Sequence, residues 1–529
     1  MIAPTARTHI GMLCVIGVAA IAVNSASYFL TGISPAYHQS SDATVHMVNW
    51  QEFTKNYSGN FKNDVLFQNY QEAPSGVLLA DAALVRTSEF LHIDILDWSI
   101  IISAVSLALF LSGVYFLVFY STKIPIIGLI ISLVSILPVI SLGLSSWGFF
   151  ALGFVPKETS LGIGVWLTIL YLRGASTNAK PKIAWFFALL GLSANFYPPA
   201  FFHYAVVLLT VEVIRGRALK KEHLLYGLIF LAASPLALYD IFIKASHFTP
   251  PVLAIIIDHY GTPLHSLSYL LVHYLRKQII YTALVAALWY VYRHVLKKEY
   301  PPLIVLWYFI WCSTLVWSLV GVGIEVFAPL YMKYLISRIS VWFYLASMII
   351  VAYTGYELWF AKFRRSVWST IVFSALLLLV LIGQTSILNV YSGLRNLGNT
   401  AADYKQYLSA VAQLHAVVPP DSLVLANPDT EANTLRTYGG VGTYVAAKDG
   451  LVSLFDGAAA EWWFVRYKEA EKVFAQKDFV AIEDYARAHD LSYYFFNMRD
   501  LQTGTSTLAK KIVLRTGQYG LIQFAPTQP

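Results

Sequence analysis

Apolar residues fill this chain in long blocks separated by short polar stretches, rather than in the periodic stripes of a soluble helical protein. A block of about 18 or more apolar residues can cross the hydrocarbon core of a bilayer as a helix. We therefore expect a polytopic α-helical membrane protein. The pattern predicts about eleven spanning helices, near 9–31, 98–120, 124–143, 158–172, 183–197, 200–214, 223–243, 278–296, 302–323, 337–360 and 367–388.

Three of these regions need separate consideration. The first block has a basic residue, an apolar stretch and small residues near Asn24, as a signal peptide does. It continues through "YFLTGI" for about 23 residues, so we interpret it as an uncleaved helix. The fifth and sixth blocks are short and flank "NFYPPAFFH", which is also compatible with a broken or re-entrant pair. The segment "SSWGFFALGFVP" is ambiguous in the same way.

Composition and charge agree with a membrane protein. Of 529 residues, 57% are hydrophobic and only 13% are charged, too few charges for a soluble protein of this size. The formal net charge is +7, but the basic residues cluster in short loops, which indicates the positive-inside rule and not nucleic-acid binding. An eleven-helix count with a cytoplasmic N-terminus puts these loops on the cytoplasmic side: Arg173 with Lys180 and Lys182, 215–221, Arg293 with Lys297 and Lys298, and 362–365.

The same count places two regions outside the cytoplasm. One is the first loop, about 33–97, and the other is everything after the transmembrane domain of residues 1–388. Residues 389–529 change character and predict a soluble α/β domain of ordinary domain size. Strands are expected in "PPDSLVLANP", around the glycine turn of "LRTYGGVGTYVAAKDGLVSL", in "LSYYFF" and twice in "KKIVLRTGQYGLIQF", and amphipathic helices in "AEWWFVRYKEAEKVFAQ" and "DFVAIEDYARAHD".

The first loop carries candidate chemistry. In "SSDATVHMVNW", Asp42 and His46 are four residues apart and would share one helical face. The carboxylate could act as a general base with the imidazole positioning it, or Asp42 could simply stabilise a helix start. Asp64, in "GNFKNDVLF", is a second acid for the same site or an ordinary turn residue.

Further candidates lie where other helices meet the same face. "VPKETSLGIGVWL" opens a helix with Lys157 and Glu158; Glu158 suits a helix start, whereas Lys157 opposes the helix dipole and favours a substrate role. His203 follows the proline pair. Lys333 precedes Arg338, which lies about one turn inside an apolar helix. Arg338 either extends to the interface or binds a phosphate through its guanidinium fork.

A metal or other cofactor is not expected. The two cysteines, Cys14 and Cys312, lie in apolar runs, which leaves no disulfide framework and no thiolate site. The chain has no DxD pair, no HxxxH and no tight cluster of oxygen ligands. A metal-independent site is therefore favoured, with a divalent metal as the alternative.

These features together resemble the GT-C superfamily of membrane glycosyltransferases, which includes the protein O-mannosyltransferases and aminoarabinose transferases. The resemblance rests on "SDATVH", "NFKNDVLF" and "VPKETSLGIGVWL", and on "LRTYGG…VAAKDG…EWWFVRYKEA", which is similar to the tail of bacterial members. It implies a bacterial inner-membrane enzyme that transfers a sugar from a polyprenyl-phosphate donor to a glycan, lipid or protein acceptor at the periplasmic face.

The resemblance also implies roles for individual residues. Asp42 would deprotonate the acceptor, His46 and Asp64 would orient it, and Lys157, Lys333 or Arg338 would stabilise the leaving phosphate. We also expect Glu158 and His203 to bind the substrate.

Three other functions remain open, one of them a non-catalytic scaffold with a sugar-binding C-terminal domain. An O-antigen ligase or polymerase would also use lipid-linked glycans. A lipid-linked glycan transporter or flippase would predict paired, interrupted helices in matching halves.

Overall fold

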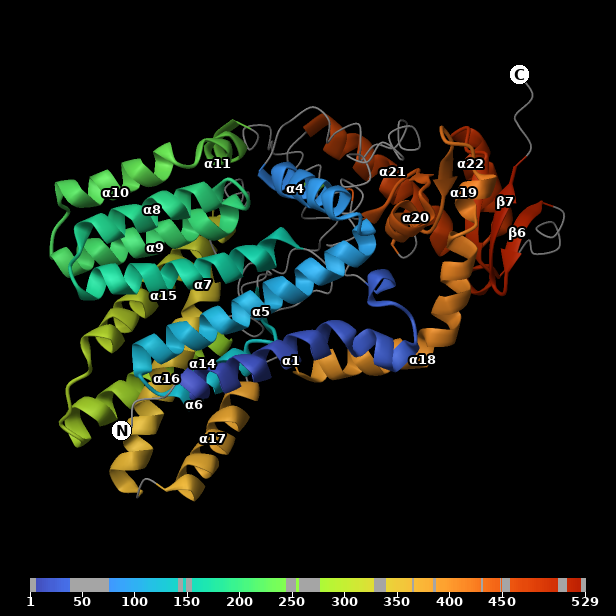
Figure 1. Cartoon of the computed structure of the whole chain (residues 1–529). Coiled ribbons are helices and arrows are strands. Elements are labelled where there is room, and N and C mark those ends of the chain that lie inside the picture. The colour runs from blue at the N-terminus through green and yellow to red at the C-terminus, as the bar shows by residue number, and fades with distance from the viewer. Residues whose placement is uncertain are drawn as a thin grey trace.

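The computed structural model is mostly helical, with a small sheet in the C-terminal region (Figure 1). It describes residues 6–38, 76–140, 146–148, 155–243, 254–255, 276–327, 339–363, 366–383, 387–429, 432–447, 449, 457–502 and 511–524. Four described helices are long and apolar enough to cross a membrane, which supports a membrane protein. They are α1 (Ala6–Thr31), α5 (Ile95–Thr122), α15 (Pro302–Phe327) and α16 (Ser340–Lys362). The count of eleven spans is not confirmed and stays a prediction.

Shorter helices occupy the other predicted segments. The fifth and sixth segments form two separate helices, α8 and α9, which lie side by side with α10 in Figure 1 and join through a turn at 195–197. The other described α-helices before residue 387 are α4 (Gly76–Leu91), α6 (Pro125–Val134), α7 (Pro156–Ser176), α8 (Lys180–Ala194), α9 (Pro198–Gly216), α10 (Lys221–Ala232), α11 (Pro235–Leu238), α14 (Arg276–Tyr290) and α17 (Val367–Ile382).

The predicted span 124–143 is wrong in its second half. Helix α6 ends at Val134, and the chain then forms β1 (Val139–Ile140), which pairs antiparallel with β2 (Ser146–Trp147). Pro138 disfavours the helical conformation at the residue before it, which explains why the apolar run does not continue as a helix. After β2, Gly148 has a φ of +104°, and a Cβ there would lie 2.6 Å from the backbone oxygen of Leu137. Glycine is therefore required at this turn.

The predicted span 223–243 is also interrupted. Helix α10 ends at Ala232, and α11 starts anew at Pro235. Asn195, at the end of α8, satisfies the backbone groups freed by this break. Its Nδ2 donates to the Ala233 oxygen at 2.8 Å, and its Oδ1 accepts from the Leu236 nitrogen at 3.0 Å. A broken helix at membrane depth needs such partners for its backbone.

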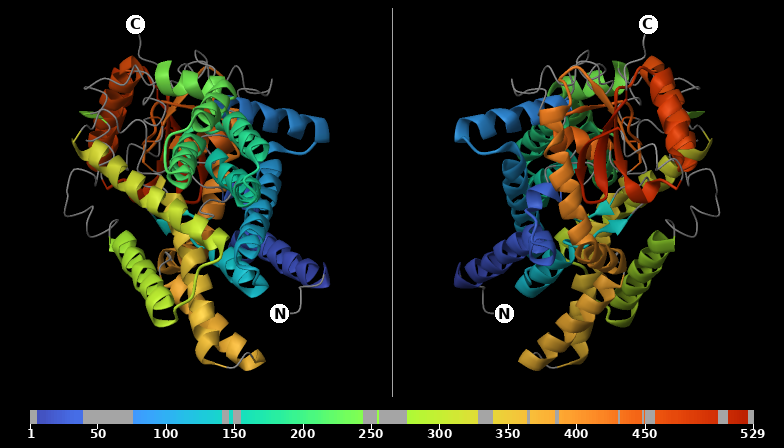
Figure 2. Two further views of the ribbon diagram at one scale, coloured as in Figure 1. Left: turned by 90° about the vertical axis from the view of Figure 1, so that its left-hand side faces the viewer. Right: turned by 90° about the vertical axis from the view of Figure 1, so that its right-hand side faces the viewer.

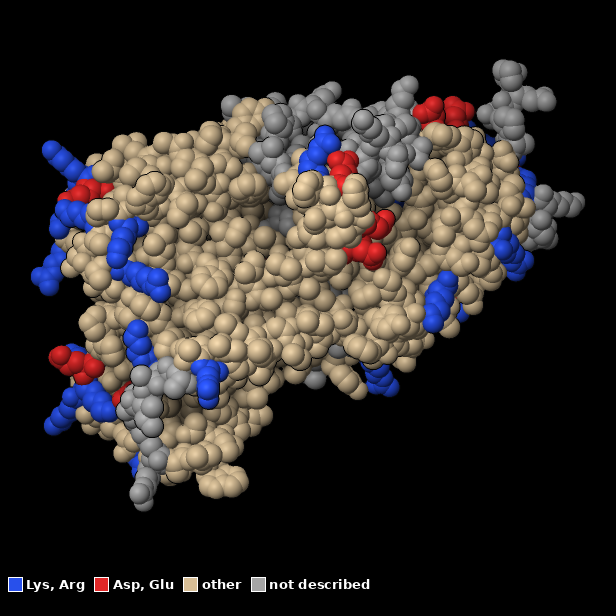
Figure 3. Space-filling model, viewed as in Figure 1, with Lys and Arg blue, Asp and Glu red and all other residues tan. Residues whose placement is uncertain are grey.

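Contacts between helix ends place the loops 177–179, 217–220 and 296–301 at one end of the helical region. We call this the basic end. Lys180 at the start of α8 pairs with Glu222 at the start of α10, with N and O 2.5 Å apart. Trp307 near the start of α15 donates to Ser121 near the end of α5 at 2.8 Å. Figure 3 shows Lys and Arg gathered here, and Figure 1 shows the C-terminal sheet at the opposite end, which we call the sheet end.

Helix α16 forms the centre of the helical region. In its most apolar 18-residue window, 83% of the residues are buried, against 22% for α1 at the periphery. It packs against α14, α15 and α17, and against β2, where the Trp147 and Trp342 rings lie 6.2 Å apart. Because Lys298, in the loop after α14, pairs with Glu357 late in α16 at 3.1 Å, both helices run toward the basic end and begin near the sheet end.

The C-terminal sheet has the strand order β4-β3-β5-β7-β6. Strand β3 is parallel to β4 and β5, whereas β7 is antiparallel to β5 and β6. Helix α18 connects this sheet to the helical region (Figure 1). The elements are α18 (Ile387–Val411), α19 (Leu414–Val417), β3 (Leu423–Leu425), α20 (Ala432–Gly439), β4 (Gly442–Thr443), α21 (Gly457–Ala475), α22 (Phe479–Ala488), β5 (Tyr493–Asn497), β6 (Ile512–Thr516) and β7 (Tyr519–Gln523).

Both faces of the sheet are covered by helices. On β5, Tyr493 and Phe495 pack in the cluster formed with α18, α19 and α20, whereas Tyr494 and Phe496 pack in the cluster with α21 and α22. This alternation is the two-residue period of a strand buried on both sides. Figure 2, right-hand view, shows helices on opposite sides of the strands. Ile255, from the segment before α14, packs in the second cluster.

The strand expected at the start of "LRTYGGVGTY" is wrong. Residues 435–439 belong to α20, and the strand β4 is only Gly442–Thr443. The predicted helices α21 and α22 and the predicted strands β3, β5, β6 and β7 are confirmed, whereas most of "KDGLVSL" lies outside the described residues.

Candidate functional site

Helix α7 begins near the sheet end with the predicted pair Lys157 and Glu158. A proline in its first turn suits a position where a helix nitrogen has no intrahelical partner, and Glu158 suits the positive end of the helix dipole. Glu158 is 5% exposed and Lys157 is partly buried. An ionisable side chain buried beside membrane helices is costly to keep, so Glu158 is the strongest described candidate among the predicted site residues.

A buried polar face of α5 lies against this first turn of α7. Ser99, Ser103 and Ser106 follow the i, i+4, i+7 spacing of one helix face, and all three are buried. The Ser106 hydroxyl is 3.2 Å from the hydroxyl of Thr159, next to Glu158 in the chain. Within the ranges given above, the Ser103 hydroxyl has no hydrogen-bond partner. The sheet end of the α5–α7 contact is therefore polar.

His203 lies deeper than Glu158. It precedes Tyr204, whose hydroxyl is 2.5 Å from that of Thr168 and whose ring stacks on Trp342 at 3.7 Å. Ten residues of α7 separate Glu158 from Thr168, about 15 Å of helix. His203 is 9% exposed, and its role in binding substrate stays a prediction.

Five predicted site residues lie outside the described part of the chain. These are Asp42, His46 and Asp64 of the first loop, and Lys333 and Arg338 before α16. Their predicted roles therefore remain predictions. His38, the last described residue before the first loop segment, contacts Tyr404 of α18, and Ile339 comes directly before α16.

Three buried polar side chains that were not predicted lie near the starts of two neighbouring helices, α14 and α16; we call them the amide–phenol cluster. Gln278, Tyr281 and Tyr344 are 2%, 1% and 0% exposed. The Gln278 amide oxygen and nitrogen and both phenol hydroxyls have no hydrogen-bond partner in the described ranges. Each unsatisfied group costs about 1–3 kcal/mol. The sequence pattern that could have indicated this cluster is a glutamine and a tyrosine three residues apart in the otherwise apolar "QIIYTALV".

Asp81 was also missed. It is 0% exposed, in helix α4 of the predicted first loop. The signal was an acid inside the apolar run "VLLADAALV". Because its carboxyl is fully buried in this loop, Asp81 is a second candidate for a catalytic acid or base.

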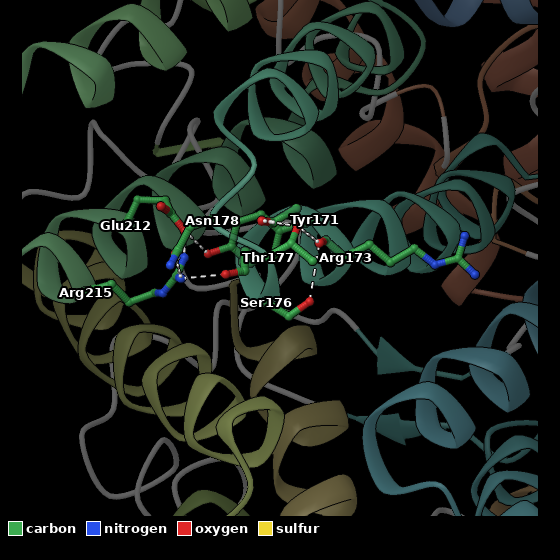
Figure 4. Close-up of polar contacts among 9 residues, drawn as sticks. Tyr171, Arg173, Ser176, Thr177, Asn178, Glu212 and Arg215 are labelled. Carbon is green, nitrogen blue, oxygen red and sulfur yellow. Dashed lines mark hydrogen bonds and ion pairs between the residues drawn. The ribbon is translucent and has the colours of Figure 1, made fainter.

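The basic end has its own polar group, but it is satisfied internally (Figure 4). The Tyr171 hydroxyl donates to Glu212 at 2.7 Å, and Arg215 pairs with the same carboxylate at 2.5 Å. Arg215 also donates to the Ala175 oxygen at 2.7 Å and to Asn178 at 3.2 Å. With its partners supplied by α7, α9 and the loop between α7 and α8, this cluster joins the helices and presents no free group for chemistry.

A contact between the start of the first loop and α18 holds the sheet region against the helices. The His38 ring stacks on Tyr404 at 4.9 Å, and its Nε2 is 3.0 Å from the Thr31 hydroxyl. Tyr404 donates to the Tyr37 oxygen, and Tyr37 packs on Tyr438 at 5.4 Å. Burial lowers the pKa of His38, so the imidazole is neutral near pH 7.

No group of three His, Cys, Asp or Glu residues suited to a metal forms within the described ranges. No family model matches the chain, and no curated protein matches it.

Proposed function

We propose that this chain is a membrane glycosyltransferase that acts at the sheet end, on a sugar carried by a polyprenyl phosphate. The observation that carries the proposal is the buried carboxyl of Glu158 in the first turn of α7, the same turn whose Thr159 hydroxyl lies 3.2 Å from Ser106 of α5, at the sheet end of the helix bundle. A lipid-linked sugar needs such a place, where a polar site meets both the bilayer and the aqueous phase.

The proposed orientation puts the basic end in the cytoplasm and the sheet end outside. Its support is the gathering of Arg173, Lys180, Arg215 and Lys298 at one end. The helix-end contacts there agree with alternating directions for the eleven proposed spans. In this orientation the first loop, the starts of α7, α14 and α16, and the C-terminal sheet share the extracytoplasmic side.

The proposed reaction follows the family that the sequence resembles. The acceptor hydroxyl loses its proton to the Asp42 carboxylate and its oxygen bonds to the anomeric carbon, while the bond from that carbon to the phosphate oxygen breaks. The phosphate leaves with the bonding pair, and Lys157, Lys333 or Arg338 neutralises it. His46 and Asp64 orient the acceptor, and Glu158 binds the substrate.

The test compares Asp42→Asn with Asp97→Asn, which changes an exposed acid in the first turn of α5. Membranes containing each variant at equal levels receive polyprenyl-phosphate donors labelled in the sugar. We expect label to move from the lipid fraction to acceptor with wild type and Asp97→Asn, and at least a hundredfold more slowly with Asp42→Asn. Full transfer by Asp42→Asn would remove the base assignment.

A flippase remains the second candidate, because buried polar residues also line transport paths. Proteoliposomes with a fluorescent polyprenyl-phosphate sugar separate the two functions. Loss of quenchable label from the outer leaflet without release of polyprenyl phosphate would favour transport. Release of polyprenyl phosphate would favour transfer, and a requirement for a diphosphate-linked oligosaccharide would favour a ligase or polymerase.

A further inference from the structure

The amide–phenol cluster occupies the buried face of α14 near the sheet end. Gln278 and Tyr281 are three residues apart and share the face that continues inward with buried Val285, whereas Ile279 and Ile280 point outward and are exposed. The start of the helix therefore turns an amide and a phenol inward and two isoleucines outward. Inward polar residues in a membrane bundle typically mark the path or site of a polar substrate.

Helix α16 completes the cluster from the other side. The Tyr281 and Tyr344 rings meet edge to face with centroids 5.7 Å apart, so the two side chains pack directly against each other. Four polar atoms of this cluster, the amide oxygen and nitrogen of Gln278 and the two hydroxyls, have no partner in the described ranges. Groups this deeply buried are normally hydrogen-bonded, so these four atoms offer donors and acceptors that a hydrogen-bonding ligand would satisfy.

The chemistry of the four atoms limits that molecule. None carries a formal charge, and an amide with two phenols both donates and accepts hydrogen bonds, as the hydroxyls of a sugar do. The ring faces offer apolar surface to the C–H faces of a pyranose. A phosphate or carboxylate would instead call for a cation.

We propose that Gln278, Tyr281 and Tyr344 bind the sugar moiety of the lipid-linked substrate through its hydroxyl groups and so select which sugar is accepted. This inference rests on the proposed function for the identity of the substrate, and its evidence is independent of Asp42. The three side chains act in binding, and no proton or bond changes at them.

The test measures binding without turnover. The full chain in nanodiscs receives two probes that differ only in the sugar, a short-chain polyprenyl-phosphate hexose and the same polyprenyl phosphate without it. We expect wild type to bind the hexose-bearing lipid more tightly. Tyr281→Phe and Tyr344→Phe, which preserve shape and delete one hydroxyl each, should each weaken it about five- to tenfold and leave the bare lipid unchanged. Gln278→Leu should do the same.

The matched control is Tyr292→Phe, a buried tyrosine in the π-helical turn Val291–Val295 that extends α14 toward the basic end. It should bind both probes as wild type does, with thermal unfolding of all variants confirming a folded chain. Equal affinity of wild type for the two probes, or no change in any cluster variant, would show that the cluster holds water only and would overturn the inference. If sugar-dependent binding is lost in the variants but no transfer occurs with wild type, the inference stands and the proposed enzyme activity fails.

Discussion

Arg436 and Asp449 form a buried ion pair at the C-terminal sheet. The guanidinium makes two contacts with the carboxylate, of 2.5 and 2.9 Å, and the side chains are 0% and 3% exposed. The same carboxylate accepts from the Ala446 nitrogen at 2.9 Å. This pair fixes the loop after β4 against α20, and it leaves neither charge open for a ligand.

Asp449→Ala should destabilise the C-terminal region by about 3–5 kcal/mol, because it leaves a buried guanidinium without its counter-charge. Thermal unfolding and protease resistance of the full-length protein in detergent would measure the loss. Arg499→Gln is the matched control: its pair with Asp403 at 3.0 Å is exposed on the arginine side, so the loss should stay below about 1 kcal/mol. Equal losses in the two variants would contradict this account of the buried pair.

His38 should make the contact between the first loop and α18 depend on pH. Burial lowers its pKa below the ordinary 6.5, so the folded state binds fewer protons than the unfolded state. The stability that this contact contributes is complete above about pH 6.5 and falls as the pH drops toward the lowered pKa. Hydrogen exchange around Tyr404, corrected for intrinsic rates, should therefore rise between pH 7.5 and 5. The same rise in His38→Phe would exclude His38 as its origin.

At the residue scale, sequence alone could identify isolated charges but not unsatisfied neutral groups. Glu158 stands out because a carboxyl beside apolar runs is conspicuous in one dimension. Gln278 and Tyr344 are more than sixty positions apart, and only the packing of α14 on α16 shows that they share a cluster. Whether Asp42 and Arg338 approach one another is likewise a question of tertiary structure.

At the element scale, the contact of α8 with α10 depends on one glycine. A methyl group at Gly191 would overlap the Phe230 backbone oxygen and lie 2.8 Å from the Ala233 Cβ. Gly191→Ala should therefore destabilise the helical region by about 1–3 kcal/mol. Gly227→Ala, on α10 with its nearest neighbour 3.9 Å away, should be neutral or stabilising by up to about 1 kcal/mol. Thermal unfolding in detergent compares them, and a stable Gly191→Ala would show that the helices can separate without loss.

The errors in predicting elements have local causes. Hydropathy predicted helices in all eleven segments, but it does not take account of backbone constraints. It therefore missed the effect of Pro138 after α6 and of the Ser234–Pro235 break after α10. In the C-terminal region, glycines suggested a strand turn where Leu435 and Arg436 lie in a helix. Burial favours the helix over a strand here, because both side chains are fully buried and α20 places Leu435 in the cluster with α18 and α19.

At the scale of the whole molecule, the distribution of charge and the position of the sheet make one joint prediction about sidedness. The test uses a chain in which both native cysteines are replaced, by Cys14→Ala and Cys312→Ala. In this background, Glu299→Cys places a thiol at the basic end, and Gln502→Cys places one beside the C-terminal sheet. Both positions are exposed. A membrane-impermeant maleimide should label the second in intact cells and the first only after permeabilisation, because basic loops are retained in the cytoplasm. Labelling of both thiols from one side would mean an incorrect span count. Labelling in the reverse pattern would place the sheet end in the cytoplasm, where Glu158 and the amide–phenol cluster could not act on a sugar presented outside.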